Sequence, residues 1–227
     1  MKVGLFVVLA LVVLLAGAGF WWRRAVRHRL LPHPSWLSWL LENPYMEAVT
    51  GSALILRRVD LAVGMRVLDV GCGAGRLTIP AAKKVGPRGR VVALDIQMKM
   101  LDKMKKRAEA SGLTNIETVL GGIGQGVLKC DSFDLAFLVT VLGEVPDREA
   151  ALGEIYTALK PGGIVSITEA IPDPHYQSRD SVYSLAQAAG FRPLHYHGNW
   201  LTFTVNFVKP EANARDNEAS FSLGDGK

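Results

Sequence analysis

The chain is poor in cysteine and contains no internal repeat. Its 227 residues include only two cysteines, Cys72 and Cys130. Their positions suit neither a disulfide framework nor a set of metal ligands. We therefore expect reduced thiols and no bound metal, and the lack of a repeat excludes solenoid architectures. A chain of this length suits one domain with a sizeable core and a small addition at one end.

Charge is absent from a run of twenty residues near the amino terminus, Val3 to Trp22. At about 1.5 Å of rise per residue, a helix of this length crosses a hydrocarbon core of about 30 Å. The sequence therefore predicts a transmembrane anchor over residues 1–22. The alternative is a cleaved signal peptide, for which Ala16-Gly17-Ala18 offers a cleavage site, although Lys2 is the only charged side chain before the run.

Positive charge follows this run at once. Nearly all of the formal net charge of +5 comes from four arginines, Arg23, Arg24, Arg27 and Arg29. Positive flanks of a span stay cytoplasmic, which favours a single-pass protein of the cell membrane with a cytoplasmic domain. The same arginines oppose the signal-peptide alternative, and their local clustering argues against a nucleic-acid surface. Tryptophan prefers the headgroup region, and four of the five tryptophans lie at or after the end of the run: Trp21, Trp22, Trp36 and Trp39.

Apolar runs and helical periods alternate over residues 61–208. Continuous apolar strands suit a parallel sheet covered on both faces, and the alternation predicts an α/β, doubly wound sheet. A helix is expected at Arg148–Lys160, ended by Pro161-Gly-Gly, and residues 23–60 are expected to form juxtamembrane and capping helices. Residues 209–227 lack any period and are expected to be disordered. The expected strands are Met65–Val70, Arg90–Leu94, Ile116–Leu120, Phe133–Val139, Gly163–Thr168, Phe191–His197 and Thr202–Val208, the last two joined as an antiparallel hairpin.

Three alternating glycines follow the first expected strand, in Val67-Leu-Asp-Val-Gly-Cys-Gly-Ala-Gly-Arg76. Glycine permits a sharp turn and a close approach of a ligand to the backbone. A dinucleotide loop would read Gly-x-Gly-x-x-Gly, but Arg76 stands at the sixth position and the carboxylate of Asp69 would repel a pyrophosphate. The pattern instead favours a cofactor that carries an ammonium or sulfonium cation.

The segment Asp69-Val-Gly-Cys-Gly-Ala-Gly75, with Asp95 at the end of the next apolar run, resembles the S-adenosylmethionine (SAM) loop of class I methyltransferases. The resemblance implies SAM as cofactor and a Rossmann-like seven-stranded sheet of order 3-2-1-4-5-7-6 with an antiparallel last strand. In its cofactor half the chain is similar to ubiquinone and menaquinone methyltransferases. Three later segments extend the resemblance over residues 45–208: Ser132-Phe-Asp-Leu135, Leu142-Gly-Glu-Val-Pro-Asp147 and Leu159-Lys-Pro-Gly-Gly163.

The resemblance assigns the cofactor contacts to the glycine loop and to the ends of the next strands. Asp95 is expected to accept hydrogen bonds from both ribose hydroxyls, although it could instead cap the following helix. Ile96 and Met98 could cover the adenine or pack in the core. Many relatives carry Gly-Asp-Ala after the third strand, whereas Gly121-Gly122-Ile123 leaves only backbone groups for the adenine here. The expected cofactor-binding residues are Asp69, Gly71, Cys72, Gly73, Gly75, Asp95, Ile96, Gly122, Ile123 and Thr140.

Candidate catalytic residues follow the fourth and fifth strands, whose carboxyl ends open onto one crevice. Glu144 stands where many relatives have histidine, and it could be a base or a solvated loop carboxylate. His175 could be a general base, since imidazole titrates near neutral pH, or an ordinary loop residue. The expected catalytic set is Glu144, His175 and Tyr176.

The sequence thus predicts a membrane-anchored, SAM-dependent methyltransferase with a small, lipophilic acceptor: a lipid amine, a quinone precursor or a hydrophobic thiol. The expected partners are this substrate and membrane lipids, with no nucleic acid. Metalloid methylation is disfavoured because the two cysteines are poorly spaced to hold a thiophilic ion. Two alternatives stay open. One is a non-catalytic SAM-binding module that recruits a partner, and the other is a nucleotide-dependent oxidoreductase, which Asp69 and Arg76 disfavour.

Overall fold

The computed structural model describes residues 51–171 and 173–211. The predicted membrane anchor, residues 23–50 and most of the expected tail lie outside these residues. No helix among the described residues is both long enough and apolar enough to cross a bilayer. The anchor over residues 1–22 therefore stays a prediction, while the predicted methyltransferase domain can be compared with the structure element by element.

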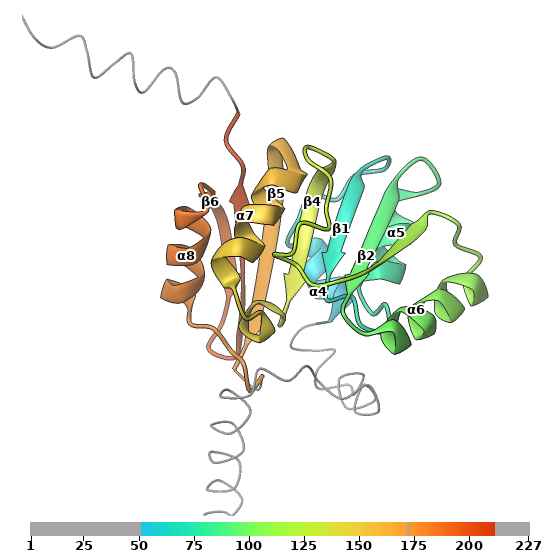
Figure 1. Cartoon of the computed structure of the whole chain (residues 1–227), viewed down its shortest axis with the longest axis horizontal. Coiled ribbons are helices and arrows are strands. Elements are labelled where there is room, and N and C mark those ends of the chain that lie inside the picture. Colours follow the sequence, from blue (N-terminus) through green and yellow to red (C-terminus); the bar gives the residue numbers. More distant parts are fainter. Residues whose placement is uncertain (1–50, 172, 212–227) are drawn as a thin grey trace, which may run out of the picture.

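The strands of the described chain form one seven-stranded sheet in the order β3-β2-β1-β4-β5-β7-β6 (Figure 1). Neighbours among β1 to β5 are parallel, and β7 is antiparallel to both β5 and β6. The strand order and the reversed last strand are therefore confirmed. The bounds are β1 Arg66–Val70, β2 Arg90–Asp95, β3 Ile116–Leu120, β4 Phe133–Val139, β5 Leu159–Ala170, β6 Arg192–Gly198 and β7 Thr202–Val208.

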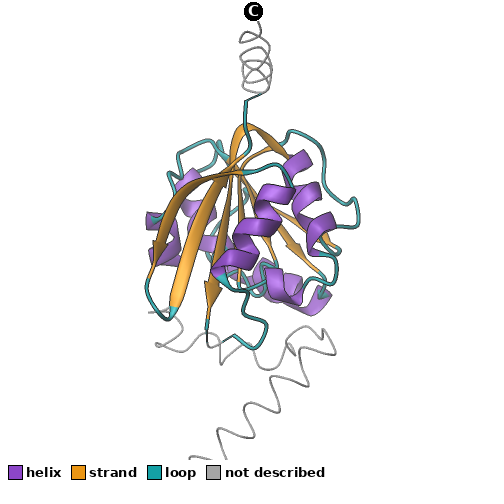
Figure 2. Cartoon of the chain, turned by 90° about the vertical axis from the view of Figure 1, so that its left-hand side faces the viewer, coloured by secondary structure: helices purple, strands orange, loops and turns teal. Residues whose placement is uncertain are grey.

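Helices cover both faces of this sheet (Figure 2). On one face α4 and α5 pack against β1 and β4, and α6 packs beside β2. On the other face α7 and α8 pack against β4, β5 and β7. Neighbouring residues of β1 serve opposite layers, since Val67 packs with α4 and α5 while Leu68 belongs to the core under α7 and α8. The helices are α4 Ser52–Arg57, α5 Thr78–Val85, α6 Met98–Ala110, α7 Arg148–Ala158 and α8 Arg179–Ala188, with a short 3-10 helix, η2, at Leu142–Glu144.

The end of α7 differs from its prediction. The helix stops at Ala158 and β5 begins at Leu159, so Pro161-Gly-Gly lies inside the strand and does not end a helix at Lys160. The backbone of Leu159 is extended because its side chain is fully buried and the residue pairs with Phe133 of β4. Burial of one leucine in the core here outweighs the helical period.

The ordered domain also continues past the expected start of the tail. The amide of Lys209 donates a hydrogen bond to the carbonyl of Gly163 over 2.8 Å, and the amide of Gly162 donates to the carbonyl of Lys209 over 2.9 Å. The Nζ of Lys209 also donates to the carbonyl of Leu159 over 2.6 Å. Lys209 therefore continues the pairing of β7 with the start of β5, which sequence composition alone does not reveal.

Candidate functional site

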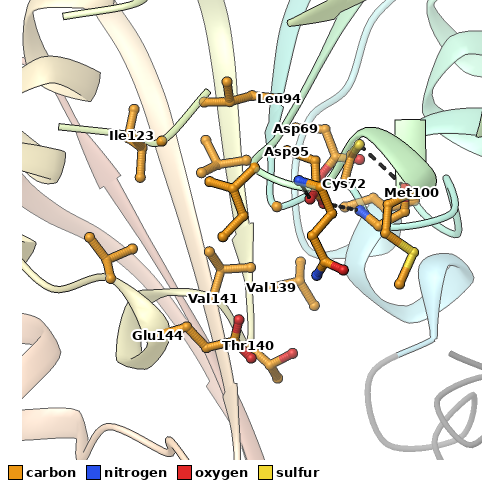
Figure 3. A pocket seen from close by; sticks show the side chains of 18 of the residues that line it. Asp69, Cys72, Leu94, Asp95, Met100, Ile123, Val139, Thr140, Val141 and Glu144 are labelled. Carbon is orange, nitrogen blue, oxygen red and sulfur yellow. Dashed lines mark hydrogen bonds between the residues drawn. The ribbon is translucent and has the colours of Figure 1, made fainter. Parts of the chain in front are cut away.

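A cavity of about 330 Å³ opens where β1, β2 and β4 end (Figure 3). Its wall is formed by α4, by the glycine loop after β1, by the end of β2, by the loop after β3 and by the segment from Val139 to Pro146. Every predicted cofactor residue except Gly75 lines this cavity, and so does Glu144. The carboxyl ends of parallel strands are the expected place for a ligand in an open α/β sheet, and the predicted residues that line the cavity lie there.

The three glycines of the loop differ in the space around their Cα atoms. All have positive φ, at +66° for Gly71, +53° for Gly73 and +86° for Gly75. A Cβ on Gly71 would lie 2.5 Å from a methyl group of Val141, and a Cβ on Gly75 would lie 2.6 Å from Met104. A Cβ on Gly73 would meet nothing within 4 Å. Gly73 therefore leaves open space for a ligand, while Gly75 packs against α6 and does not line the cavity, so its assignment to the cofactor site stays a prediction.

Asp95 ties the glycine loop to the end of β2. One carboxylate oxygen accepts a hydrogen bond from the amide of Gly73 over 2.9 Å, and the other accepts from the amide of Gln97 over 2.8 Å. Gln97 is the N-cap of α6, so Asp95 lies two residues before the cap and is not itself the cap. Each carboxylate oxygen has a second lone pair, so Asp95 can hold the loop and still accept hydroxyl donors from the cavity.

Asp69 is the second buried carboxylate in the cavity wall. The hydroxyl of Thr78 donates to it over 2.6 Å. Burial raises the pKa of Asp69 to about 6, and nearby Asp95 adds to the rise while the hydrogen bond from Thr78 opposes it. A cation in the cavity would lower this pKa again and would be attracted by both carboxylates. The pair of acids beside the open Gly73 therefore fits a ligand with a positive charge and hydroxyl donors.

Cys72 lies between these carboxylates without being reactive. Its side chain is buried, and its thiol lies 3.5 Å from the carbonyl of Gly73. Burial, followed by the charges of Asp69 and Asp95, raises the pKa of the Cys72 thiol far above its usual range. The thiol therefore stays protonated and forms part of the cavity wall.

The loop after β3 supplies the remaining cofactor positions. Gly122 and Ile123 line the cavity together with Gln125, a residue that the sequence analysis missed. The side-chain carbonyl of Gln125 accepts a hydrogen bond from the amide of Gly122 over 3.3 Å. An amide side chain both donates and accepts, so Gln125 offers hydrogen bonds where this chain lacks the aspartate of its relatives. Ile96 and Met98 are exposed, so the alternative that they pack in the core is wrong.

Thr140 and Glu144 form the opposite side of the cavity from the glycine loop (Figure 3). Thr140 has a φ of +55°, a strained value for a threonine, and its amide donates to the carbonyl of Thr168 in β5 over 2.8 Å. Glu144 ends η2 and is half-buried. Burial, reinforced by the carboxylates of Asp173 and Asp95, raises the pKa of Glu144 to about 8. Glu144 is therefore a carboxylate that exchanges its proton near neutral pH, and the alternative of a fully solvated loop carboxylate is wrong.

His175 and Tyr176 do not line this cavity, so the geometry does not join them to Glu144 and their catalytic role stays a prediction. They line a second cavity of about 370 Å³ together with Gly143 and Arg148. A Cβ on Gly143 would lie 1.8 Å from the carbonyl oxygen of His175, so this loop lies directly against η2. The ring of Tyr176 packs edge-on against Phe203, with centroids 6.2 Å apart. His175 therefore packs against η2 through its backbone, and Tyr176 packs against β7.

A hydrogen-bonded path links α4 to Thr140. Arg58 follows α4, and its guanidinium donates to the hydroxyl of Thr204 in β7 over 2.8 Å. The hydroxyls of Thr204 and Thr168 lie 2.8 Å apart, and the carbonyl of Thr168 holds the amide of Thr140. The Nδ2 of Asn206 donates to the carbonyl of Arg58 over 2.6 Å. Because Ser52 and Ile55 of α4 line the cavity, as Thr140 does, this path connects two parts of its wall.

Comparison with known proteins agrees with this geometry. The profile of a family described as a methyltransferase domain matches residues 61–190, more than half of the chain. The chain belongs to this methyltransferase family. Membership confirms the predicted enzyme class and its methyl donor, SAM, and it removes the oxidoreductase alternative.

Several curated methyltransferases are similar in sequence. The chain is 32% identical over 156 residues to a demethylmenaquinone methyltransferase of Geobacillus stearothermophilus, covering 69% of this chain and 58% of that protein. It is 33% identical over 120 residues to a nocamycin O-methyltransferase of Saccharothrix syringae, covering 53% and 43%. The chain thus spans less than two thirds of the length of these two relatives. Their names state different methyl acceptors.

Solved structures share the fold. A SAM-dependent methyltransferase from Aquifex aeolicus superposes with a TM-score of 0.72 at 24% identity, covering 78% of this chain and 99% of that chain. A Haemonchus contortus N-methyltransferase in complex with S-adenosylhomocysteine gives a TM-score of 0.61 at 18% identity, covering 70% and 52%. The seven-stranded architecture is therefore that of known methyltransferases.

Proposed function

We propose that this protein transfers a methyl group from SAM to a small lipophilic acceptor at the cytoplasmic face of the cell membrane. The observation that carries the proposal is the cavity at the strand ends, where Asp69 and Asp95 flank an open backbone position at Gly73. Bound SAM supplies an activated methyl group and its own leaving group. The residues of the chain then need only bind, orient and, where the acceptor is protonated, remove a proton.

The cofactor half of the cavity has a complementary group for each part of SAM. Asp69 offers a negative charge to the amino-acid cation, and the free lone pairs of Asp95 accept the ribose hydroxyls. The backbone of Gly122 and the amide of Gln125 face the side where the adenine would lie. These four residues all line the cavity, so one ligand can contact them together.

The acceptor half combines an apolar wall with one ionisable group. Its apolar wall comes from α4 and β4, through Ile55 and Val139, and from Val141 and Val145 beside η2. Glu144 is the titratable group on this side, and in its ionised form it accepts the proton that the acceptor loses on methylation. A pKa of about 8 leaves a useful ionised fraction at neutral pH and makes the carboxylate a stronger base than an exposed one.

Two further observations support a lipophilic acceptor and a membrane location. The relatives of the chain include demethylmenaquinone methyltransferases, whose named acceptor is a quinone precursor. The charge-free run from Val3 to Trp22, followed by four arginines, suits a single span with the domain in the cytoplasm. Anchoring an enzyme in the membrane that dissolves its acceptor raises the effective concentration of the acceptor at the enzyme, and it needs no additional contact between the two.

The test uses the full chain in lipid nanodiscs with methyl-labelled SAM and a total lipid extract. We expect label in an extractable lipid from the wild type and from Asp102→Ala, a control that changes an exposed carboxylate of α6. We expect much less label from Asp95→Ala, because its affinity for SAM is lower. SAM binding with no transfer to any lipid or soluble fraction would overturn the proposal and favour a non-catalytic SAM-binding module. Label found only in a water-soluble fraction would confirm methyl transfer but would show that the acceptor is not lipophilic.

A further inference from the structure

Exposed apolar side chains flank the mouth of the cavity on both sides. Met98 is 49% exposed and Leu120 is 51% exposed, and both lie at the ends of β2 and β3. On the other flank Ile171, which follows β5, is 39% exposed, and Trp200, in the turn between β6 and β7, is 78% exposed. We call these four residues the apolar rim. Ile96 is not counted, because it lines the cofactor cavity itself.

The sheet topology puts the apolar rim on one edge. Leu120 ends β3, and Met98 starts the helix after β2. Ala170, at the end of β5, pairs with Thr202 at the start of β7, so the turn that holds Trp200 lies at the same edge. In the strand order β3-β2-β1-β4-β5-β7-β6, the ends of β1 and β4, which carry the cavity, lie between the two flanks.

The opposite edge of the sheet differs in its exposed apolar side chains. Single exposed apolar residues are common on soluble proteins, so each rim residue alone would need no explanation. At the opposite edge, Val63 is 63% exposed and Leu194, near the start of β6, is 43% exposed. Among the described residues, the edge with the cavity therefore carries more of the exposed large apolar side chains, including Trp200, the most exposed of them.

We infer that the apolar rim docks on the surface of a lipid bilayer, so that the cavity opens directly onto the membrane. This inference rests on the proposed function. Tryptophan, leucine and isoleucine side chains next to exposed cations favour the headgroup region, and exposed Lys99 directly follows Met98.

The path of the chain favours a bilayer over a protein partner. The described residues begin at Gly51, and Ser52 already lines the cavity, so the polypeptide enters the domain at the edge with the rim. Only residues 23–50 separate this point from the charge-free run that is long enough to span a membrane. A tether at this edge holds the rim, rather than the opposite edge, close to the lipid surface.

The test measures how deeply Trp200 enters the lipid. The full chain is reconstituted in phosphatidylcholine and phosphatidylglycerol vesicles with acyl chains brominated near the headgroup. In the reporter protein Trp200 is the sole tryptophan, and the matched control carries Trp200→Phe and Val63→Trp in the same background. Unchanged SAM affinity checks that both are folded. The background substitutions to phenylalanine are at Trp21, Trp22, Trp36 and Trp39.

We expect brominated lipid to quench Trp200 several-fold more strongly than the tryptophan at position 63. Equal, weak quenching at the two positions overturns the inference. Protection of Trp200 from aqueous acrylamide without quenching by lipid also overturns it, because the edge would then be covered by protein.

A second measurement separates this inference from the proposed function. The double variant Ile171→Ser, Trp200→Ser should raise the apparent KM for a demethylated menaquinol with a long isoprenoid tail. It should leave turnover of a short-tailed, soluble analogue unchanged. Quenching of Trp200 without turnover of either acceptor would support docking and reject the proposed function. Turnover without quenching of Trp200 would support the proposed function and reject docking.

Discussion

The guanidinium of Arg58 donates a hydrogen bond of 2.8 Å to the hydroxyl of Thr204, a residue 146 positions later in the chain. This contact fastens the segment after α4 to β7, and Thr204 in turn contacts Thr168, which holds the strained backbone of Thr140. The two walls of the acceptor half of the cavity, α4 and the end of β4, are therefore linked through side chains that do not themselves line it.

Removing this link should loosen the acceptor side while leaving the cofactor side intact. Arg58→Met should raise the KM for the acceptor several-fold with little change in SAM affinity. It should also lower the free energy of unfolding by about 0.5–1.5 kcal/mol for the lost hydrogen bond. Arg57→Met changes the exposed neighbour and is the matched control. Kinetics and urea unfolding measure both effects, and equal behaviour of the two variants would contradict the link.

The glycine loop makes a prediction about SAM affinity. Asp95→Ala removes hydrogen bonds to a charged group, each worth about 1.5–3 kcal/mol, so the Kd for SAM should rise at least tenfold. Gly73→Leu should also abolish binding, because its side chain projects into open cavity, at a cost of about 1–2 kcal/mol in stability for the left-handed backbone. Calorimetry provides the measurement. Wild-type affinity in both variants would show that the ligand binds elsewhere.

Glu144 should give the pH profile of kcat an acidic limb, in which the rate falls at low pH. Its pKa is raised to about 8, so the ionised base is depleted at low pH and kcat should increase as pH rises towards about 8, then level off. Glu144→Gln should lower kcat and remove this limb while SAM affinity is kept. An acceptor that ionises by itself would instead leave the profile of Glu144→Gln identical to that of the wild type.

A buried carboxyl in β5 predicts how stability changes with pH. Burial raises the pKa of Glu169 to about 8, and the amide of Gln177 donates to it over 3.1 Å. The folded state therefore keeps a proton that the unfolded state releases near its ordinary pKa, so stability should fall as pH rises from about 4.5 to about 8. Glu169→Gln should show a smaller fall. Denaturant titrations at pH 5, 7 and 9, with Glu149→Gln as an exposed control, would detect the difference.

The fold and the cofactor loop were predictable from local patterns. Continuous apolar runs located the strands, and the glycine loop with Asp69 and Asp95 located the cavity, because these residues lie at the strand ends in any sheet of this order. The seven-residue bounds of Phe133–Val139 and Thr202–Val208 agree with the expected strands.

The rest depends on tertiary contacts. His175 is close to Glu144 in the expected topology, but the loop after β5 packs so tightly on Gly143 that His175 lies on the other side of η2. Gly75 looks like its neighbours in sequence, and only the position of Met104 on α6 distinguishes it. The contact of Arg58 with Thr204 spans nearly the whole domain, although the alternating polar residues of β7 were a visible signal.

The most direct test of the account compares transfer within and between membranes. The full chain is reconstituted into vesicles with methyl-labelled SAM outside, and a long-tailed demethylated menaquinol is placed either in the same vesicles or in separate protein-free vesicles at the same bulk concentration. If the acceptor reaches the enzyme through the bilayer, label should enter the menaquinol many-fold faster when enzyme and acceptor share a bilayer. Equal rates in the two arrangements, or no label in the lipid phase in either, would contradict it.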